Sequence, residues 1–327
     1  MKLVFVMSLN MSLGKWHELG LLERESKFLA DVGMFDYICE GVLHNASRRS
    51  HDLIPVITLS GLFRLLFTSR QSFLLVTNQD SSLFFSLLIL LVFSRRVRLV
   101  YRSGYDQAFF FRQEGKIFRE KIFAFLSYLG ESLCQVRITS WEHTNASDSR
   151  AHNFVIPNSE AKTALFSERE GRQWEMIHVG RNSQQKRSKL CRKVLSNYKS
   201  ILVSDSVPLS EALPENVTCY SKIPNDEVLR LMGRTKYLLL LSKYEGSPKV
   251  LIEAVMQGCI PVLSENVIQI LPGALQPYFI PAMVTRSRVV NLREIEESFL
   301  IGADAVADYY SREKCAEKWR AALKHAL

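Results

Sequence analysis

Four charged side chains in the second half of the chain have types and spacings that suit chemistry on one ligand. Glu245 and Glu253 lie on either side of a predicted helix start, and Arg181 and Lys186 follow a predicted strand further upstream. A guanidinium and an ammonium stabilise charge that builds on a phosphate, and carboxylates accept hydrogen bonds from hydroxyl groups. The pattern predicts a site for a ligand that carries both kinds of group, such as a nucleotide sugar.

A strand, loop, helix and strand must position the two glutamates. Continuous apolar runs over 236–242 and 259–265 are typical of strands buried in a parallel sheet. Between them Ser247 is a suitable N-cap, Pro248 suits the first helical position, and Gly258 favours the left-handed turn that ends a helix. The sequence predicts a helix of about ten residues that begins at Pro248.

The helix start determines which part of a ligand each glutamate can reach. With the helix beginning at Pro248, Glu245 lies in the loop and Glu253 on the second helical turn. Ligands of parallel sheets bind at the carboxyl ends of the strands, where the next helix attracts a phosphate. Glutamates also occur near helix starts simply because they favour the helix dipole, so this pattern alone leaves that explanation open.

The two basic residues follow an apolar strand predicted over 174–180. This strand ends in Gly180 and Arg181, and Lys186 comes five residues later, before a helix-like segment. Together the two cations can stabilise charge that develops on a leaving phosphate. A solvated basic loop is the alternative interpretation, because the surrounding QKRSK segment is charged enough to lie at the surface.

The motifs around these residues resemble those of the retaining glycosyltransferases of family 4. EGSPKVLIEA matches the EG-x-P-x-V-x-x-EA signature of that family, and Arg181 and Lys186 match its Gly-Arg and Lys spacing. The resemblance implies that Glu245 contacts hydroxyls of the transferred sugar and that Glu253 holds the ribose diol. Arg181 and Lys186 would neutralise the diphosphate leaving group, which makes them, with Glu245, the expected catalytic residues.

The resemblance also implies a donor site and a mechanism. The backbone would cradle the sugar and the diphosphate at Gly180, Gly246, Ser247, Pro248, Lys249, Val250 and Leu251. Transfer would retain the anomeric configuration by a front-face route, in which the leaving diphosphate takes the proton of the acceptor hydroxyl. We expect no metal and no cofactor besides the nucleotide-diphosphate sugar, since the chain has no D-x-D motif.

Strands and helices alternate along the whole chain, which indicates parallel α/β sheets. The family resemblance implies the GT-B fold, with two Rossmann-like domains whose parallel sheets face each other across a cleft. We expect an acceptor domain over 1–150 and a donor domain over 151–305, joined by a polar linker over 144–153. A terminal helix over 306–327 would cross back to the first domain.

The N-terminal half resembles a narrower set of family members, the bacterial enzymes of surface polysaccharide assembly, including lipopolysaccharide. The similar segments are MSLGKWHELGLLERE, TNQDSS and VYRSGYD. The resemblance of these segments implies an acceptor-side role for six residues, which are Gly14, Lys15, Trp16, Arg102, Tyr105 and Asp106. Many members hold the sugar with a histidine here, where this chain has Arg-Ser-Gly-Tyr. The segment after Glu265 also departs from the family's glycine-rich turns.

An apolar run over 81–93 is shorter than the ~18 to 20 residues that span a bilayer. A buried crossover helix is one interpretation of this run. A helix at the membrane interface is the other, favoured by the four arginines that follow, Arg95, Arg96, Arg98 and Arg102. The net charge of +9 suits the binding of anionic lipids and diphosphates. The sequence contains no zinc-finger or RNA-binding signature that would favour nucleic acid.

The cysteines and the first residues predict a location. Six cysteines are scattered without metal-ligand spacing, as in a reduced protein, and the opening apolar run is too short for a signal peptide. We expect a cytoplasmic protein that can contact the inner face of the anionic cytoplasmic membrane peripherally.

The main hypothesis is a retaining hexosyltransferase that moves a sugar from a nucleotide-diphosphate sugar to a lipid-linked glycan in cell-surface polysaccharide biosynthesis. A second hypothesis is a noncatalytic nucleotide-sugar-binding subunit of a polysaccharide assembly complex. A third is another GT-B enzyme, such as a nucleotide-sugar epimerase. Both glutamates and both cations are present, which favours the transferase.

Overall fold

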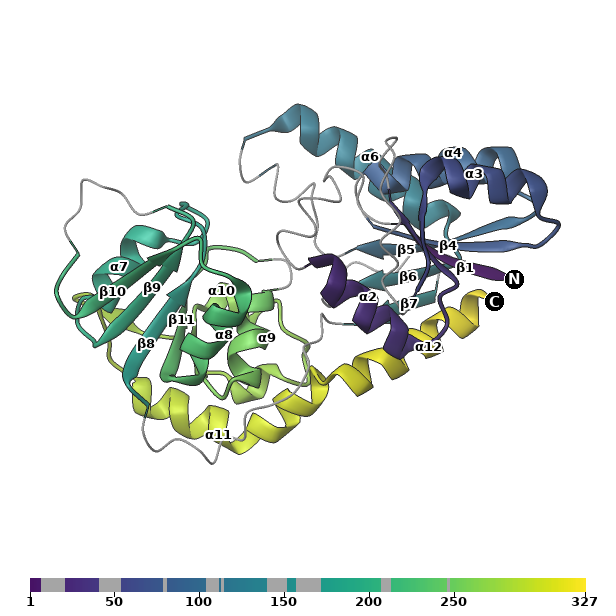
Figure 1. Ribbon diagram of the computed structural model, residues 1–327. Coiled ribbons are helices and arrows are strands. Elements are labelled where there is room, and N and C mark those ends of the chain that lie inside the picture. Colours follow the sequence, from purple (N-terminus) through teal and green to yellow (C-terminus); the bar gives the residue numbers. More distant parts are fainter. Residues whose placement is uncertain are drawn as a thin grey trace. The chain divides into compact units, whose positions relative to one another are not determined.

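The computed structural model describes residues 1–6, 21–40, 54–78, 81–103, 112, 115–139, 152–156, 172–206, 213–245 and 248–327. The chain divides into two compact units, each with its own parallel sheet and flanking helices (Figure 1). Unit 1 comprises Met1–Pro157 and Cys315–Leu327, and unit 2 comprises Asn158–Lys314. The predicted α/β class is therefore confirmed.

Unit 1 contains a seven-stranded sheet in the order β3-β2-β1-β4-β5-β6-β7, and every strand pair in it is parallel. The strands are β1 (Lys2–Val6), β2 (Tyr37–Glu40), β3 (Val56–Thr58), β4 (Phe73–Asn78), β5 (Val97–Ser103), β6 (Val136–Thr139) and β7 (His152–Val155). Successive residues Leu74, Leu75 and Val76 of β4 are all buried, which requires that both faces of the sheet are covered.

Helices cover the two faces of this sheet. α2 (Leu21–Val32) and α12 (Arg312–Ala326) pack on one face, where Trp319 meets Phe28 and Phe35 edge-on. α3 (Leu59–Thr68), α4 (Ser81–Phe93) and α6 (Ile117–Leu133) belong to the other face (Figure 1).

The apolar run over 81–93 forms α4, the predicted crossover helix between β4 and β5. It is not buried all round, because Leu87 and Phe93 face the core while Leu91 and Val92 are exposed. None of the helices in the described part of the chain is both long enough and apolar enough to span a bilayer.

Two parts of unit 1 differ from the sequence-based expectation. α3 was not predicted, although the Thr58 hydroxyl caps its first turn by accepting a hydrogen bond from the Gly61 N–H at 3.1 Å. The expected linker over 144–153 ends in β7, and the following stretch lies in the sheet of unit 1 rather than opening the second domain. β7 joins that sheet because Phe154 and Ile156 pack into the core of unit 1.

Unit 2 contains a five-stranded parallel sheet in the order β10-β9-β8-β11-β12. The strands are β8 (Trp174–Val179), β9 (Ser200–Ser204), β10 (Val217–Ser221), β11 (Thr235–Leu240) and β12 (Ile260–Leu263). The chain adds strands to one side of β8 and then resumes on its other side with β11. The strand order therefore reverses between β8 and β11, and such a switch point is the usual ligand site of an open α/β sheet.

Five helices and two small elements complete the described part of unit 2. The helices are α7 (Ser188–Leu195), α8 (Asn225–Gly233), α9 (Lys249–Met256), α10 (Glu265–Ile268) and α11 (Leu292–Tyr309). A single 3₁₀ turn, η2 (Gln276–Tyr278), and a two-stranded ribbon of β13 (Val284–Thr285) and β14 (Arg288–Val289) lie between α10 and α11.

Further differences lie at the ends of helices. α9 begins at Lys249, so the prediction that Pro248 is the first helical residue was one residue early. Its end agrees with the prediction: Gly258 has a φ of 78°, and the Gly258 and Cys259 N–H groups donate to Val255 and Ala254. The terminal helix expected over 306–327 is divided between α11 and α12, and the Ser311 hydroxyl caps α12 by accepting from the Lys314 N–H.

Candidate functional site

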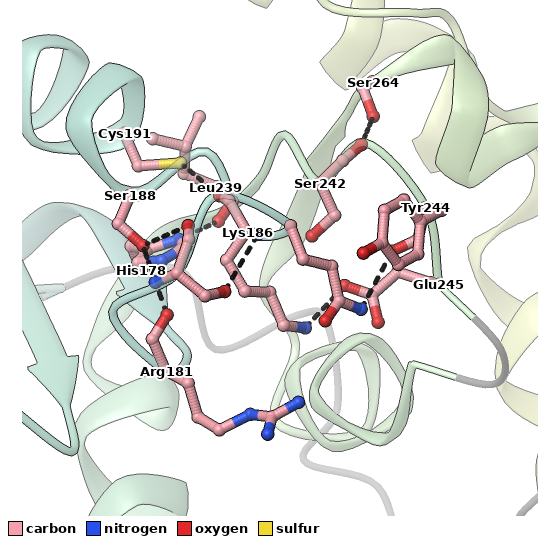
Figure 2. A network of polar contacts seen from close by, with 12 residues as sticks. His178, Arg181, Lys186, Ser188, Cys191, Leu239, Ser242, Tyr244, Glu245 and Ser264 are labelled. Atoms are coloured by element: carbon pink, nitrogen blue, oxygen red, sulfur yellow. Dashed lines mark hydrogen bonds and ion pairs between the residues drawn. The ribbon is translucent and has the colours of Figure 1, made fainter. Parts of the chain in front are cut away.

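An ion pair joins the loops that follow β8 and β11. Lys186 Nζ lies 2.5 Å from Glu245 Oε1, and the side chains are 13% and 8% exposed. β8 and β11 are neighbouring parallel strands, so both loops leave the same edge of the sheet at the switch point. The structure thus brings together a cation and a carboxylate that the sequence placed in separate motifs (Figure 2).

Hydrogen bonds to backbone carbonyls hold the same two loops together. The Lys243 N–H donates to the Gln185 carbonyl at 2.8 Å, and the Gln185 side-chain amide donates to the Tyr244 carbonyl at 3.1 Å. The Asn266 amide, at the start of α10, donates to the Lys243 carbonyl at 2.6 Å. The ion pair therefore rests on a framework whose position does not depend on the charged side chains themselves.

The loop after β8 has its own internal support. The Ser188 hydroxyl accepts a hydrogen bond from the Ser183 N–H at 2.9 Å and donates one to the Arg181 carbonyl at 3.1 Å. At the end of β9, Asp205 accepts from the Asn182 N–H at 2.9 Å, and this bond lowers the pKa of the Asp205 carboxyl. These contacts fix the path of the chain from Arg181 to the start of α7.

His178 lies beneath this loop, buried near the end of β8. Its Nδ1 is 2.9 Å from the Leu239 carbonyl, and because a carbonyl can only accept, Nδ1 carries the proton. Burial, with a smaller contribution from the nearby charges of Lys186 and Arg192, lowers the pKa of His178 to about 4. Nε2 has no hydrogen-bond partner in the described part of the chain, and a Cβ on Gly180 would lie 3.4 Å from it.

Arg181 is the second predicted phosphate-binding cation. Its side chain is exposed and extends from the loop without a contact to the other residues drawn (Figure 2). Within the described ranges no side chain forms an ion pair with its guanidinium. The guanidinium can therefore bind an anion without first giving up an internal partner.

The second glutamate lies where the sequence predicted it. Glu253 is the fifth residue of α9, on the second turn, and is buried at 7% exposure. Pro248 is the N-cap residue, and Lys249, Val250 and Leu251 form the first turn of this helix, with the positive end of its dipole toward the loop. Gly246 and Ser247 lie outside the described residues.

The acceptor-side predictions are only partly covered. Gly14, Lys15, Trp16, Tyr105 and Asp106 lie outside the described residues. Arg102, on β5, places its guanidinium carbon 5.7 Å from the Phe5 ring and 5.4 Å from the Trp319 ring. Its role toward an acceptor stays a prediction.

No group of three or more His, Cys, Asp or Glu in the described segments has the geometry to hold a metal ion. All six cysteines are free thiols, and burial raises the pKa of Cys191, on the buried face of α7, to about 11. That thiol is protonated at neutral pH and does not act as a nucleophile.

Sequence reasoning missed three supports of the site. His178 looks like an ordinary member of an apolar strand, but a lone histidine two residues before the Gly-Arg pair is a usable signal. Asp205 follows a predicted strand at its carboxyl end, which is where site residues gather in such sheets. Gln185 offers no signal, because its partner lies 59 residues away in the chain.

The ion pair, the exposed guanidinium and the helix start form a candidate anion-binding site at the switch point of a parallel α/β sheet. Among the comparisons with known proteins, the one with solved structures finds matches. Neither a protein-family model nor a curated protein sequence matches this chain. Solved structures match over almost its whole length.

Three of these structures illustrate the likeness. Sucrose-phosphate synthase from Thermosynechococcus elongatus has a TM-score of 0.63 at 12% identity, over 98% of this chain and 94% of that one. AviGT4, a glycosyltransferase involved in avilamycin A biosynthesis, has a TM-score of 0.60 at 11% identity, over 100% of this chain and 97% of that one. WaaG, a glycosyltransferase involved in lipopolysaccharide biosynthesis, has a TM-score of 0.52 at 13% identity, over 98% of this chain and 94% of that one. The chain therefore has the predicted GT-B fold.

Proposed function

We propose that this protein is a glycosyltransferase whose unit 2 binds a nucleotide-diphosphate sugar. The observation that carries the proposal is the Lys186–Glu245 pair, which joins the loops after β8 and β11 where the strand order reverses. Arg181 lies on the first of these loops, and Glu253 lies on the helix that follows the second. The family resemblance and the glycosyltransferases among the similar structures support the same class of enzyme.

Each charged residue then has a role in donor binding. Lys186 and Arg181 stabilise the diphosphate as the sugar bond breaks, and the start of α9 adds the positive end of its dipole. Glu245 accepts hydrogen bonds from hydroxyls of the sugar. The short Lys186–Glu245 distance fits this assignment, because the sugar is bonded directly to the phosphate that Lys186 holds.

Glu253 binds the ribose diol of the nucleotide. It lies four residues after Lys249, which is ~6 Å along the helix axis. That displacement separates Glu253 from the helix start, at which we propose that the diphosphate binds. Because the two cations supply the charge neutralisation, we propose that transfer needs no metal, and that it retains the anomeric configuration as in family 4.

We propose a lipid-linked glycan of cell-surface polysaccharide biosynthesis as the acceptor, with a hexose as the transferred sugar. This rests on the N-terminal segments that resemble surface-polysaccharide enzymes and on the lipopolysaccharide role named for WaaG.

Release of nucleoside diphosphate tests the proposal. The full chain is incubated with UDP-, GDP- and ADP-sugars and with membrane extracts that contain lipid-linked glycans. We expect release with one donor, its loss in Glu245→Gln, and wild-type release in the matched control Glu297→Gln, whose carboxylate pairs with Arg293 on the surface of α11. Binding of a donor without release would favour the noncatalytic subunit, and equal rates in Glu245→Gln would contradict the site.

A further inference from the structure

An exposed apolar surface extends over three helices on one face of unit 1. We call it the outer apolar surface, and its members are Phe67 of α3, Leu91 and Val92 of α4, and Phe118, Phe125 and Tyr128 of α6. Phe118, Leu91 and Phe67 are 77%, 74% and 71% exposed. Single exposed apolar residues are ordinary, whereas a group of large ones marks an interaction surface.

Helical spacing aligns the members on α6. Phe118, Ile122 and Phe125 recur at i, i+4 and i+7 and so lie on one stripe of the helix. Near the C-terminal end of α6, Leu129 packs against the core beneath α3 and α4. The first turns of α6 extend beyond the end of the sheet of unit 1 (Figure 1).

The parts of the surface on α3 and α4 are held rigidly. Arg96, just after α4, donates to the Ser69 carbonyl at 2.6 Å and to the Leu66 carbonyl at 2.7 Å, and so ties the end of α3 to α4. The Phe67 ring meets the Phe93 ring edge-on at 5.0 Å. Phe67 and the exposed residues of α4 thus have fixed positions without any covering partner in the described part of the chain.

Positive charge borders these apolar residues. Residues 54–78 and 81–103 contain six arginines and no aspartate or glutamate. Arg64 lies one turn before Phe67, and Arg95 lies one turn after Leu91; both are exposed. Arg98 and Arg102 do not contribute, because they contact the α12 side of unit 1.

α6 repeats the same pairing of apolar and basic residues. Lys121 is exposed and lies one turn before Phe125. The acidic residue in the first turn, Glu120, accepts a hydrogen bond from Arg112 at 2.7 Å, so an arginine already neutralises its charge.

We propose that the outer apolar surface docks on an anionic lipid bilayer. Its apolar side chains enter the acyl boundary, and Arg64, Arg95 and Lys121 bind lipid phosphates. A second copy of the chain fits less well, because a two-fold interface sets the same patch against itself and brings arginine to arginine. The docking stands independently of the proposed sugar transfer, and its test uses no sugar donor.

Vesicle flotation with the full chain tests the docking. Vesicles of phosphatidylcholine alone and of phosphatidylcholine mixed with phosphatidylglycerol are compared for the wild type and for Phe118→Ser/Phe125→Ser. Ile301→Ser is the matched control, because Ile301 is 84% exposed but lies on α11 of unit 2. Arg95→Ser is paired with Arg234→Ser, an exposed arginine in unit 2.

We expect binding only to the anionic vesicles. Partitioning should fall roughly tenfold or more in Phe118→Ser/Phe125→Ser and about fivefold in Arg95→Ser, with both controls like the wild type. No binding of the wild type, equal binding to both vesicle types, or unchanged binding of the two variants would each overturn the proposal. A wild-type dimer that Phe118→Ser/Phe125→Ser converts to a monomer would overturn it too and assign the surface to self-association.

Discussion

Acid should destabilise unit 2 through His178, and the substitution His178→Asn should remove this effect. The native imidazole is buried and neutral, with Nδ1–H bound to the Leu239 carbonyl. Asparagine places an amide donor near the position of Nδ1 and cannot take up a proton in this pH range. The variant therefore retains the polar contact and loses only the titration.

The magnitude follows from the two pKa values of the histidine. Burial lowers the pKa from 6.5 to about 4 in the native state. Between these values the unfolded chain binds a proton that the native chain does not, so the stabilisation present above pH 6.5 is lost as pH falls. At ~1.4 kcal/mol per pH unit, the free energy of unfolding drops by about 2 kcal/mol by pH 5 and by about 3 kcal/mol in total.

Hydrogen exchange can measure this drop locally. Peptides from β8 and β11 are followed by mass spectrometry at pH 7 and pH 5, with intrinsic exchange rates divided out. From pH 7 to pH 5, the free energy of protection of the β8 and β11 peptides should fall by about 2 kcal/mol more in the wild type than in His178→Asn. Peptides from β4 in unit 1 should change equally in both proteins. Equal pH dependence of β8 in the two proteins would refute the reasoning.

Three further predictions concern single side chains. Glu245→Gln should lower turnover roughly a hundredfold and lower the free energy of unfolding by about 1–3 kcal/mol, as measured by steady-state kinetics and urea unfolding; unchanged kinetics would remove it from the site. Arg181→Ala should lower turnover roughly a hundredfold with the protein's stability unchanged, because its guanidinium supports no fold contact; a loss of stability would contradict this. Gly302→Ala should destabilise unit 2 by about 1–3 kcal/mol in thermal unfolding, because a Cβ there would lie 2.1 Å from the Tyr278 ring. The control Gly233→Ala should be neutral or stabilising, because its Cβ would meet only an ordinary contact at 3.6 Å.

The sequence predicted those elements whose signals are local. α4 was placed to the residue, because polar residues bound the apolar run over 81–93 on both sides. The start of α9 was one residue early because the fixed φ of Pro248 suits both the cap and the first helical position. The break between α11 and α12 was missed because Tyr310 and Ser311 include neither glycine nor proline.

The candidate site shows the same division between local and distant information. Glu253 was placed correctly because its position depends only on the start of its own helix. The contact of Lys186 with Glu245 could not be derived, since it depends on β8 and β11 being neighbours, and strand order is a property of the folded sheet. His178 was missed because a buried histidine is recognised by what surrounds it in space.

Isothermal titration calorimetry of the full chain against UDP, GDP, ADP and their sugar conjugates tests the central claim most directly. The account predicts that one nucleotide and its sugar conjugate bind, that Glu253→Ala weakens both by roughly tenfold or more through loss of the ribose contact, and that the exposed control Glu215→Ala binds like the wild type. A folded protein that binds none of these ligands, or one whose affinity is the same in Glu253→Ala, would contradict a nucleotide-sugar site in unit 2.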